Sequence, residues 1–132
     1  MTRGKLAAKH VALPLALGAL SYLVWRSALP FWPSHVALWK SAPSVLRDHF
    51  ADGAWGWALG AFVSIVWLGE RTPRRAAWIG VAALVAGGVE CLQYAHVLRG
   101  AFDPVDLVVQ VGAVVLAAST VGGTRKWISA PV

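Results

Sequence analysis

Long apolar stretches alternate with short, polar and mostly basic connections along the chain. Four stretches are apolar over most of their length, at about 11–29, 53–68, 76–97 and 105–121. A helix needs about 20 mostly apolar residues to cross the hydrocarbon of a bilayer. The pattern therefore predicts an all-α protein, a polytopic helical membrane bundle of about four transmembrane helices in a single domain, 1–132.

Local signals fit the ends of these predicted helices. Asp52 and Asp103 stand where the second and fourth stretches begin, and an acidic cap is favoured at the positive end of a helix dipole. Pro104 suits a first helical position, and Gly122-Gly123 is a typical helix stop.

The segment 30–52 lacks the apolar character of a span. It contains Pro30, Pro33, Pro43, Trp32 and Trp39. Tryptophan favours the depth of the membrane–water interface. We expect an interfacial loop here, with a short helix within it as an alternative.

Composition supports a membrane protein. Of 132 residues, 58% are hydrophobic and 14% are charged, whereas about 25% are charged in an average soluble domain. A soluble chain of this size has too little volume to bury so much apolar surface. The net charge of +6 comes from residues between apolar stretches, and no nucleic-acid-binding motif is present, so no nucleic-acid partner is expected.

The first stretch follows Arg3, Lys5 and Lys9, as a signal peptide would. Its apolar core is long, however, and Trp25-Arg26 stands where small residues should precede a cleavage site. A retained helix is favoured.

The distribution of Lys and Arg predicts orientation. With the N-terminus inside, the inner segments hold eight of the twelve: Arg3, Lys5, Lys9, Arg71, Arg74, Arg75, Arg125 and Lys126. Because cytoplasmic segments are enriched in basic residues, both termini are expected in the cytoplasm of a multi-pass cell (inner) membrane protein.

Polar side chains gather toward the opposite side of the predicted bundle. Glu90 is embedded in the third stretch, where a carboxylate costs roughly 2.5 kcal/mol or more to insert. The short connection after that stretch makes the third and fourth helices antiparallel neighbours, and the second begins on the same side. The candidate ligand-binding residues are Glu90, Gln93, Arg99, Asp103, Asp106, Gln110, Asp52 and His49.

A structural interpretation stands beside this one. The aspartates could be helix caps in the head-group layer, with Arg99 extending to pair with them. The carboxylates of Asp52, Glu90, Asp103 and Asp106 could hold a hard divalent cation, although their spacing does not demand a metal. No established catalytic motif is present, no cofactor is expected, and the question of an enzyme stays open, leaning toward none.

The region from Glu90 to Val115 resembles the VanZ-like family of small bacterial membrane proteins. The matching pattern is Glu90-x-x-Gln93, Arg99, Phe102-Asp103, Asp106 and Gly112-Ala113, with Gln110 where the family usually has asparagine. The segment Arg47 to Trp55, with Asp48, His49 and Asp52, is similar to the polar segment before the family's middle span. The resemblance implies a multi-span protein of a bacterial inner membrane.

Three functions follow as hypotheses. The leading one is an outward-facing polar pocket that binds a lipid-linked cell-envelope component, in a protein whose other partners are membrane lipids. The alternatives are a small proton or cation transport protein, since intramembrane acids serve as relays, and a structural or assembly protein.

Overall fold

The computed structural model describes residues 2–25, 43–70 and 73–123. The helices, in chain order, are α1 (Arg3–Ala7), the π-helical segment η1 (Ala8–Ala12), α2 (Leu13–Trp25), α4 (Ser44–Val66), α5 (Pro73–Tyr94) and α6 (Pro104–Gly123). No β-strand occurs among these residues, so the predicted all-α class is confirmed. The prolines and tryptophans predicted in a loop at 30–39 lie outside the described residues.

The first three elements form one continuous helical run. Its π-helical segment ends directly before α2, whose second residue is Pro14. Proline has no N–H to donate, and its ring crowds the carbonyl four residues earlier, here that of His10. A π-turn widens the helix at this point and accommodates the ring.

Helix α4 begins earlier than the hydropathy pattern predicts. It starts at Ser44 rather than near Gly53, so the prediction of a loop is wrong for 44–52. Pro43 occupies the position before the first helical residue, and no glycine or proline interrupts the chain between Ser44 and Asp52. Asp52 is consequently an interior helical residue and not a cap.

Helices α5 and α6 form the predicted antiparallel hairpin. The Asp103 side chain accepts a hydrogen bond from the backbone N–H of Val105 (2.8 Å), which confirms it as the cap of α6. The helix begins at Pro104, as predicted, and is described as far as Gly123. The connection turns at His96 and Gly100, which have φ values of 57° and 146°.

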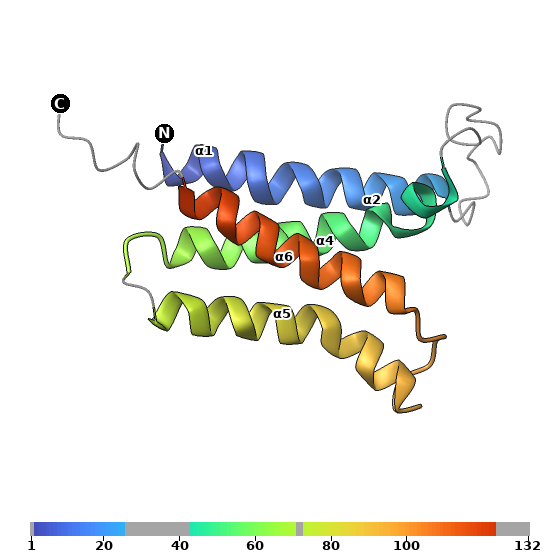
Figure 1. Cartoon of the computed structure of the whole chain (residues 1–132). Coiled ribbons are helices and arrows are strands. Elements are labelled where there is room, and N and C mark those ends of the chain that lie inside the picture. Colours follow the sequence, from blue (N-terminus) through green and yellow to red (C-terminus); the bar gives the residue numbers. More distant parts are fainter. Residues whose placement is uncertain (1, 26–42, 71–72, 124–132) are drawn as a thin grey trace, which may run out of the picture.

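In Figure 1 the continuous run of α1, η1 and α2 lies beside α4, α5 and α6, and successive elements run in opposite directions. Helix α4 packs against α2, α5 and α6. One end of the bundle holds the start of α1, the end of α4, the start of α5 and the end of α6, and we call it the basic end. Its charged residues among those described are Arg3, Lys5, Lys9, Glu70, Arg74 and Arg75.

The opposite end, where α4 and α6 begin, is called the acidic end. It holds the other five of the six acidic residues of the chain, namely Asp48, Asp52, Glu90, Asp103 and Asp106. The main buried apolar cluster lies in the basic half of the bundle and consists of Leu6, Ala61, Ile65, Leu68, Ala117 and Val121. Acidic residues and apolar core are thus concentrated in different halves.

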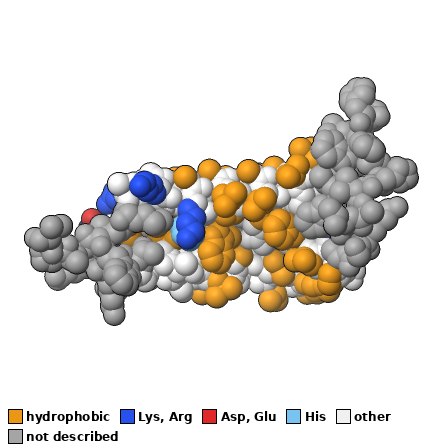
Figure 2. Space-filling model, turned by 90° about the horizontal axis from the view of Figure 1, so that it is seen from above, with side chains coloured by type: hydrophobic (Ala, Val, Ile, Leu, Met, Phe, Trp, Pro, Cys, Tyr) orange, Lys and Arg blue, Asp and Glu red, His pale blue; other side chains and the backbone are white. Residues whose placement is uncertain are grey.

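Among the described residues, three helical runs are long and apolar enough to cross a membrane: Arg3–Leu23, Pro73–Tyr94 and Pro104–Gly123. Only 17% to 22% of the apolar window of each run is buried inside the bundle. Figure 2 shows the result on one face, where hydrophobic side chains occupy the middle of the molecule and Lys and Arg lie toward the basic end. Apolar surface exposed on this scale belongs in lipid.

Candidate functional site

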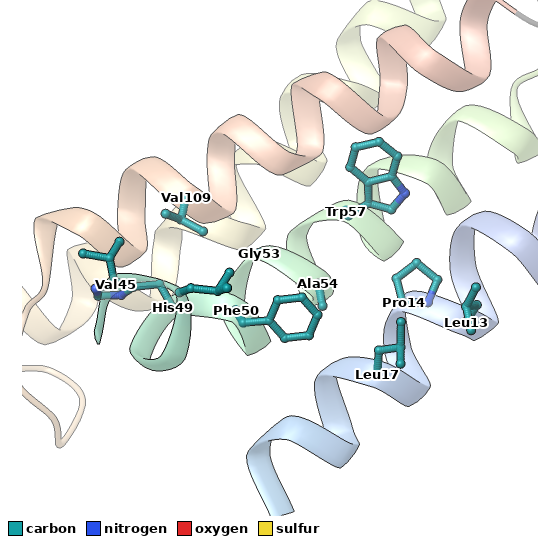
Figure 3. A pocket seen from close by; sticks show the side chains of 11 residues that line it. Leu13, Pro14, Leu17, Val45, His49, Phe50, Gly53, Ala54, Trp57 and Val109 are labelled. Atoms are coloured by element: carbon teal, nitrogen blue, oxygen red, sulfur yellow. The ribbon is translucent and has the colours of Figure 1, made fainter. Parts of the chain in front are cut away.

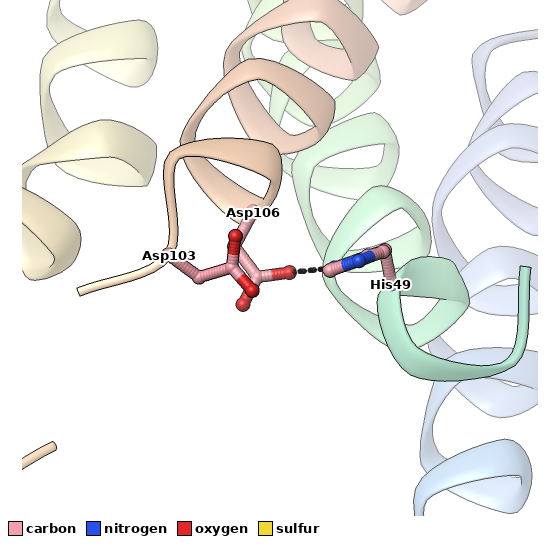
Figure 4. A group of neighbouring side chains, drawn as sticks. All are labelled: His49, Asp103 and Asp106. Carbon is pink, nitrogen blue, oxygen red and sulfur yellow. Dashed lines mark hydrogen bonds and ion pairs between the residues drawn. The ribbon is translucent and has the colours of Figure 1, made fainter. Parts of the chain in front are cut away.

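The candidate site lies at the acidic end, where α4, α5 and α6 converge. His49 of α4 contacts Asp106 of α6, with Nδ1 of the imidazole 2.5 Å from Oδ1 of the carboxylate (Figure 4). The two side chains are 14% and 21% exposed, so the pair is largely shielded by the bundle. The contact joins residues 57 positions apart in the sequence.

A second polar contact joins the same two helices one turn deeper. The side-chain amide of Gln110 donates to Oδ1 of Asp52 (3.1 Å). Asp52 follows His49 by three residues and Gln110 follows Asp106 by four, so both contacts use one face of each helix. This pairing explains why Asp52 is tolerated inside a helix that packs against apolar neighbours.

Glu90 of α5 is the most buried acid among the candidates, with 5% of its surface exposed. Its Oε2 accepts a hydrogen bond from the backbone N–H of Asp103 (3.0 Å). The Gln93 amide nitrogen, in the orientation that satisfies its neighbours, donates to the same Glu90 oxygen (3.2 Å) and to the carbonyl of Ala101 (3.1 Å). Glu90 therefore ties α5 to the start of α6.

The charge at this end is dominated by carboxylates. The hydrogen bond to Asp106 raises the pKa of His49, which lies before the apolar part of α4 that begins at Gly53. Partial burial opposes this shift in the pKa, and the negative charges of Asp106, Asp103 and Asp48 reinforce it. The imidazole is thus held toward its protonated form by the acids around it.

Arg99, the eighth candidate residue, lies outside this group. Its residue is exposed in the connection after α5, and among the described residues it forms no ion pair with any of the acids. Arg47 pairs instead with Asp48 (3.1 Å), but their side chains are 37% and 53% exposed, and such surface pairs contribute little. Seven of the eight predicted residues therefore belong to one network, and Arg99 lies outside it.

Three members of the network have the chemistry of metal ligands. One donor atom each from His49, Asp103 and Asp106 can be chosen so that all three lie within 4.8 Å of one another (Figure 4). An imidazole nitrogen with two carboxylate oxygens suits a first-row divalent ion such as Mn²⁺ or Zn²⁺. Two hydrogen bonds already hold Asp103 in place: its N–H donates to Glu90, and its side chain accepts from the N–H of Val105.

An apolar groove adjoins the network and was missed by the sequence analysis. It has a volume of about 480 Å³ between α2, α4 and α6 (Figure 3). The lining residues are Leu13, Pro14, Leu17, Val45, Leu46, His49, Phe50, Gly53, Ala54, Trp57 and Val109. His49 belongs to both the groove and the acidic network.

The groove has a sequence signal that depends on where α4 begins. Phe50, Ala54 and Trp57 are spaced at i, i+4 and i+7, which is one helical face. The hydropathy pattern predicts a loop at 44–52, and a loop has no helical face, so this spacing is not recognised from hydropathy. Extending the helix back to Ser44 makes the face visible.

Comparison of the chain with protein-family models, with curated proteins and with solved structures finds no match.

Proposed function

We propose that the chain is a four-span membrane protein in which α4 is the fourth span. With 23 residues at 1.5 Å per residue, α4 is about 34 Å long, which covers most of the roughly 40–45 Å thickness of a bilayer with its head-group layers. It packs along α2, α5 and α6, so it shares their depth. Its polar residues before Gly53 stand at one end, where they reach the head-group layer.

The proposed membrane is a bacterial inner membrane with the basic end in the cytoplasm and the acidic end outside. The concentration of Lys and Arg at the basic end supports this orientation. Membership of the VanZ-like family is part of the proposal and rests on the motif residues. Its support is that Glu90, Gln93, Asp103 and Asp106 lie in one network.

The function that the site supports best is binding of an amphiphilic, lipid-linked component of the cell envelope at the outer face. The observation that carries this proposal is the position of His49, which lines the apolar groove and also contacts Asp106. A molecule with its hydrocarbon part in the groove would place its polar part directly at the acids. Pockets that are apolar with a few convergent polar groups are typical ligand sites.

The charge of the network indicates the chemistry of the polar part. The network contains four carboxylates, those of Asp52, Glu90, Asp103 and Asp106, and one imidazole, and Arg99 is not part of it. A head group with an amine or with sugar hydroxyl groups would be accepted by these carboxylates. A phosphate would require a bridging cation, because the network supplies no guanidinium to bind it.

Native mass spectrometry of the protein extracted in mild detergent tests this function. Asp106→Asn removes the carboxylate that contacts His49, while Asp48→Asn removes the same charge from an exposed residue outside the network. We expect a defined envelope lipid to stay with the wild type and with Asp48→Asn, and to leave Asp106→Asn. Equal retention by all three proteins would contradict the proposal.

Cation handling is the second candidate, and the geometry of His49, Asp103 and Asp106 favours it. Titration of the purified protein with Mn²⁺ would show saturable binding that is lost in Asp103→Asn and kept in Asp48→Asn. Transport would also require polar groups along a path through the bundle. Five of the six acids, however, lie at one end of it. A flux assay in proteoliposomes that stays flat for wild type would eliminate transport and leave binding.

A further inference from the structure

A second cleft lies at the other end of the molecule, between α5 and α6. It has a volume of about 320 Å³ and is lined by Arg75, Ile79, Val115, Ala118, Ser119 and Gly122. It shares no residue with the acidic network or with the apolar groove. Arg75 is the only charged side chain among its lining residues.

Arg75 is held in this cleft by the backbone of α6. Its Nη2 donates to the carbonyl of Ala118 (2.8 Å). A methyl group built on Gly122 would overlap the guanidinium, with Nη1 at 2.9 Å and Cζ at 3.0 Å, so only glycine leaves room for the side chain here. The guanidinium is therefore seated against α6 instead of extending along the bundle surface, as a snorkelling arginine does.

The hydrogen-bonding capacity of Arg75 is largely unused by the described part of the chain. A guanidinium has five N–H donors, and the buried Nε has no hydrogen-bond partner among the described residues. All six Asp and Glu side chains are described, and none forms an ion pair with Arg75. A partly buried cation without a counter-charge is costly, and an anion in the cleft would remove that cost.

We propose that the Arg75 cleft binds a phosphate group. The planar fork of a guanidinium matches two phosphate oxygens, and basic pockets between transmembrane helices bind the head groups of anionic lipids. The cleft opens where α5 begins and α6 ends, which is the depth of a lipid head group. The phosphate can come from an anionic phospholipid or from free phosphate in solution.

The chain supplies matched variants to test this site. Arg75→Gln removes the cation from the cleft, and Arg74→Gln removes an equal charge from the exposed neighbouring residue. Gly122→Ala keeps the charge and displaces the guanidinium. Each protein, in a neutral detergent, is titrated with phosphatidylglycerol or with phosphatidylcholine, and bound lipid is measured by native mass spectrometry.

We expect wild type and Arg74→Gln to prefer phosphatidylglycerol, and Arg75→Gln and Gly122→Ala to bind it about tenfold more weakly. Displacement of the lipid by inorganic phosphate would identify free phosphate as a sufficient ligand, and failure to displace it would identify the lipid as the source. Equal weakening by Arg74→Gln and Arg75→Gln would overturn the proposal, because it would reflect general charge. If Arg75→Gln does not fold, Gly122→Ala decides: wild-type affinity in that variant would also overturn it.

Discussion

Gly56 of α4 lies directly against the backbone of Gln110 in α6. A methyl group built on Gly56 would come 2.5 Å from the Gln110 carbonyl oxygen and 3.1 Å from its Cα. The side chain of the same Gln110 reaches Asp52, one turn before Gly56. The close approach of two helices and the polar network therefore depend on the same contact.

Gly56→Ala should force α4 and α6 apart. The overlap is with backbone, which cannot rotate away, and overpacking of this kind costs typically about 1–3 kcal/mol. We expect a lower melting temperature and weaker lipid retention at the acidic end. Gly112→Ala is the control, because nothing lies within 4 Å of its added methyl group. Equal melting temperatures for the two variants would show that the crossing does not depend on Gly56.

Gly100→Ala should disturb Gln93 from the connecting turn. Gly100 has a φ of 146°, and an added methyl group would lie 2.7 Å from the amide carbon Cδ of Gln93. Backbone strain of this kind costs of order 1–3 kcal/mol, and the displaced amide would lose its contact with Glu90. The effect is measured by comparing the thermal unfolding of Gly100→Ala with that of a control, Gly88→Ala, in which the added methyl group contacts nothing. A melting temperature for Gly100→Ala as high as that of Gly88→Ala would disprove it.

Two substitutions at Glu90 separate a structural role from a binding role. Glu90→Ala removes the acceptor for the Asp103 N–H and should cost about 1–3 kcal/mol, the penalty of an unsatisfied buried group. Glu90→Gln keeps an oxygen acceptor and should lose less than half as much stability. If the site binds a cationic head group, Glu90→Gln should nevertheless release the lipid. Full lipid retention by a stable Glu90→Gln protein would favour the structural or assembly role.

The contact between His49 and Asp106 should make stability depend on pH. Because the pKa of His49 is raised above its ordinary value of 6.5, the stabilisation is complete below that value and is lost as pH rises through the folded-state pKa. Melting temperatures between about pH 6 and about pH 9 should fall more steeply for wild type than for His49→Gln. His96→Asn, at an exposed histidine outside the network, should keep the wild-type slope. Parallel curves for wild type and His49→Gln would contradict this assignment.

The apolar pattern predicted the helical class and most helix ends, because contact with lipid determines which stretches of the chain are apolar. Pro104 begins α6 as the local signals indicate, and Asp103 is its cap. The Gly56-x-x-x-Gly60 motif also lies at a helix contact, since a side chain on Gly60 would overlap the backbone of Val114. These features are local, or repeat with the helical period, and can be recognised without knowing the fold.

The start of α4 and the apolar groove could not be predicted in the same way. A polar helix and a polar loop have similar hydropathy, so hydropathy alone does not distinguish them at 44–52. The signals that do are Pro43 before the helix and the helical spacing of Phe50, Ala54 and Trp57. The position of Arg99 depends on the turn conformation at His96 and Gly100, which charge pairing alone does not determine. The groove requires the crossing of α2 over α4, which is a property of the folded bundle.

One measurement tests most directly whether groove and acidic network bind the same molecule. Val45→Trp fills the groove from an exposed lining position, and Val66→Trp makes the same change at the other end of α4. Native mass spectrometry should show that Val45→Trp and Asp106→Asn lose the same lipid, and that Val66→Trp and Asp48→Asn retain it. Retention of that lipid by Val45→Trp, or loss of different molecules from the two site variants, would contradict the account.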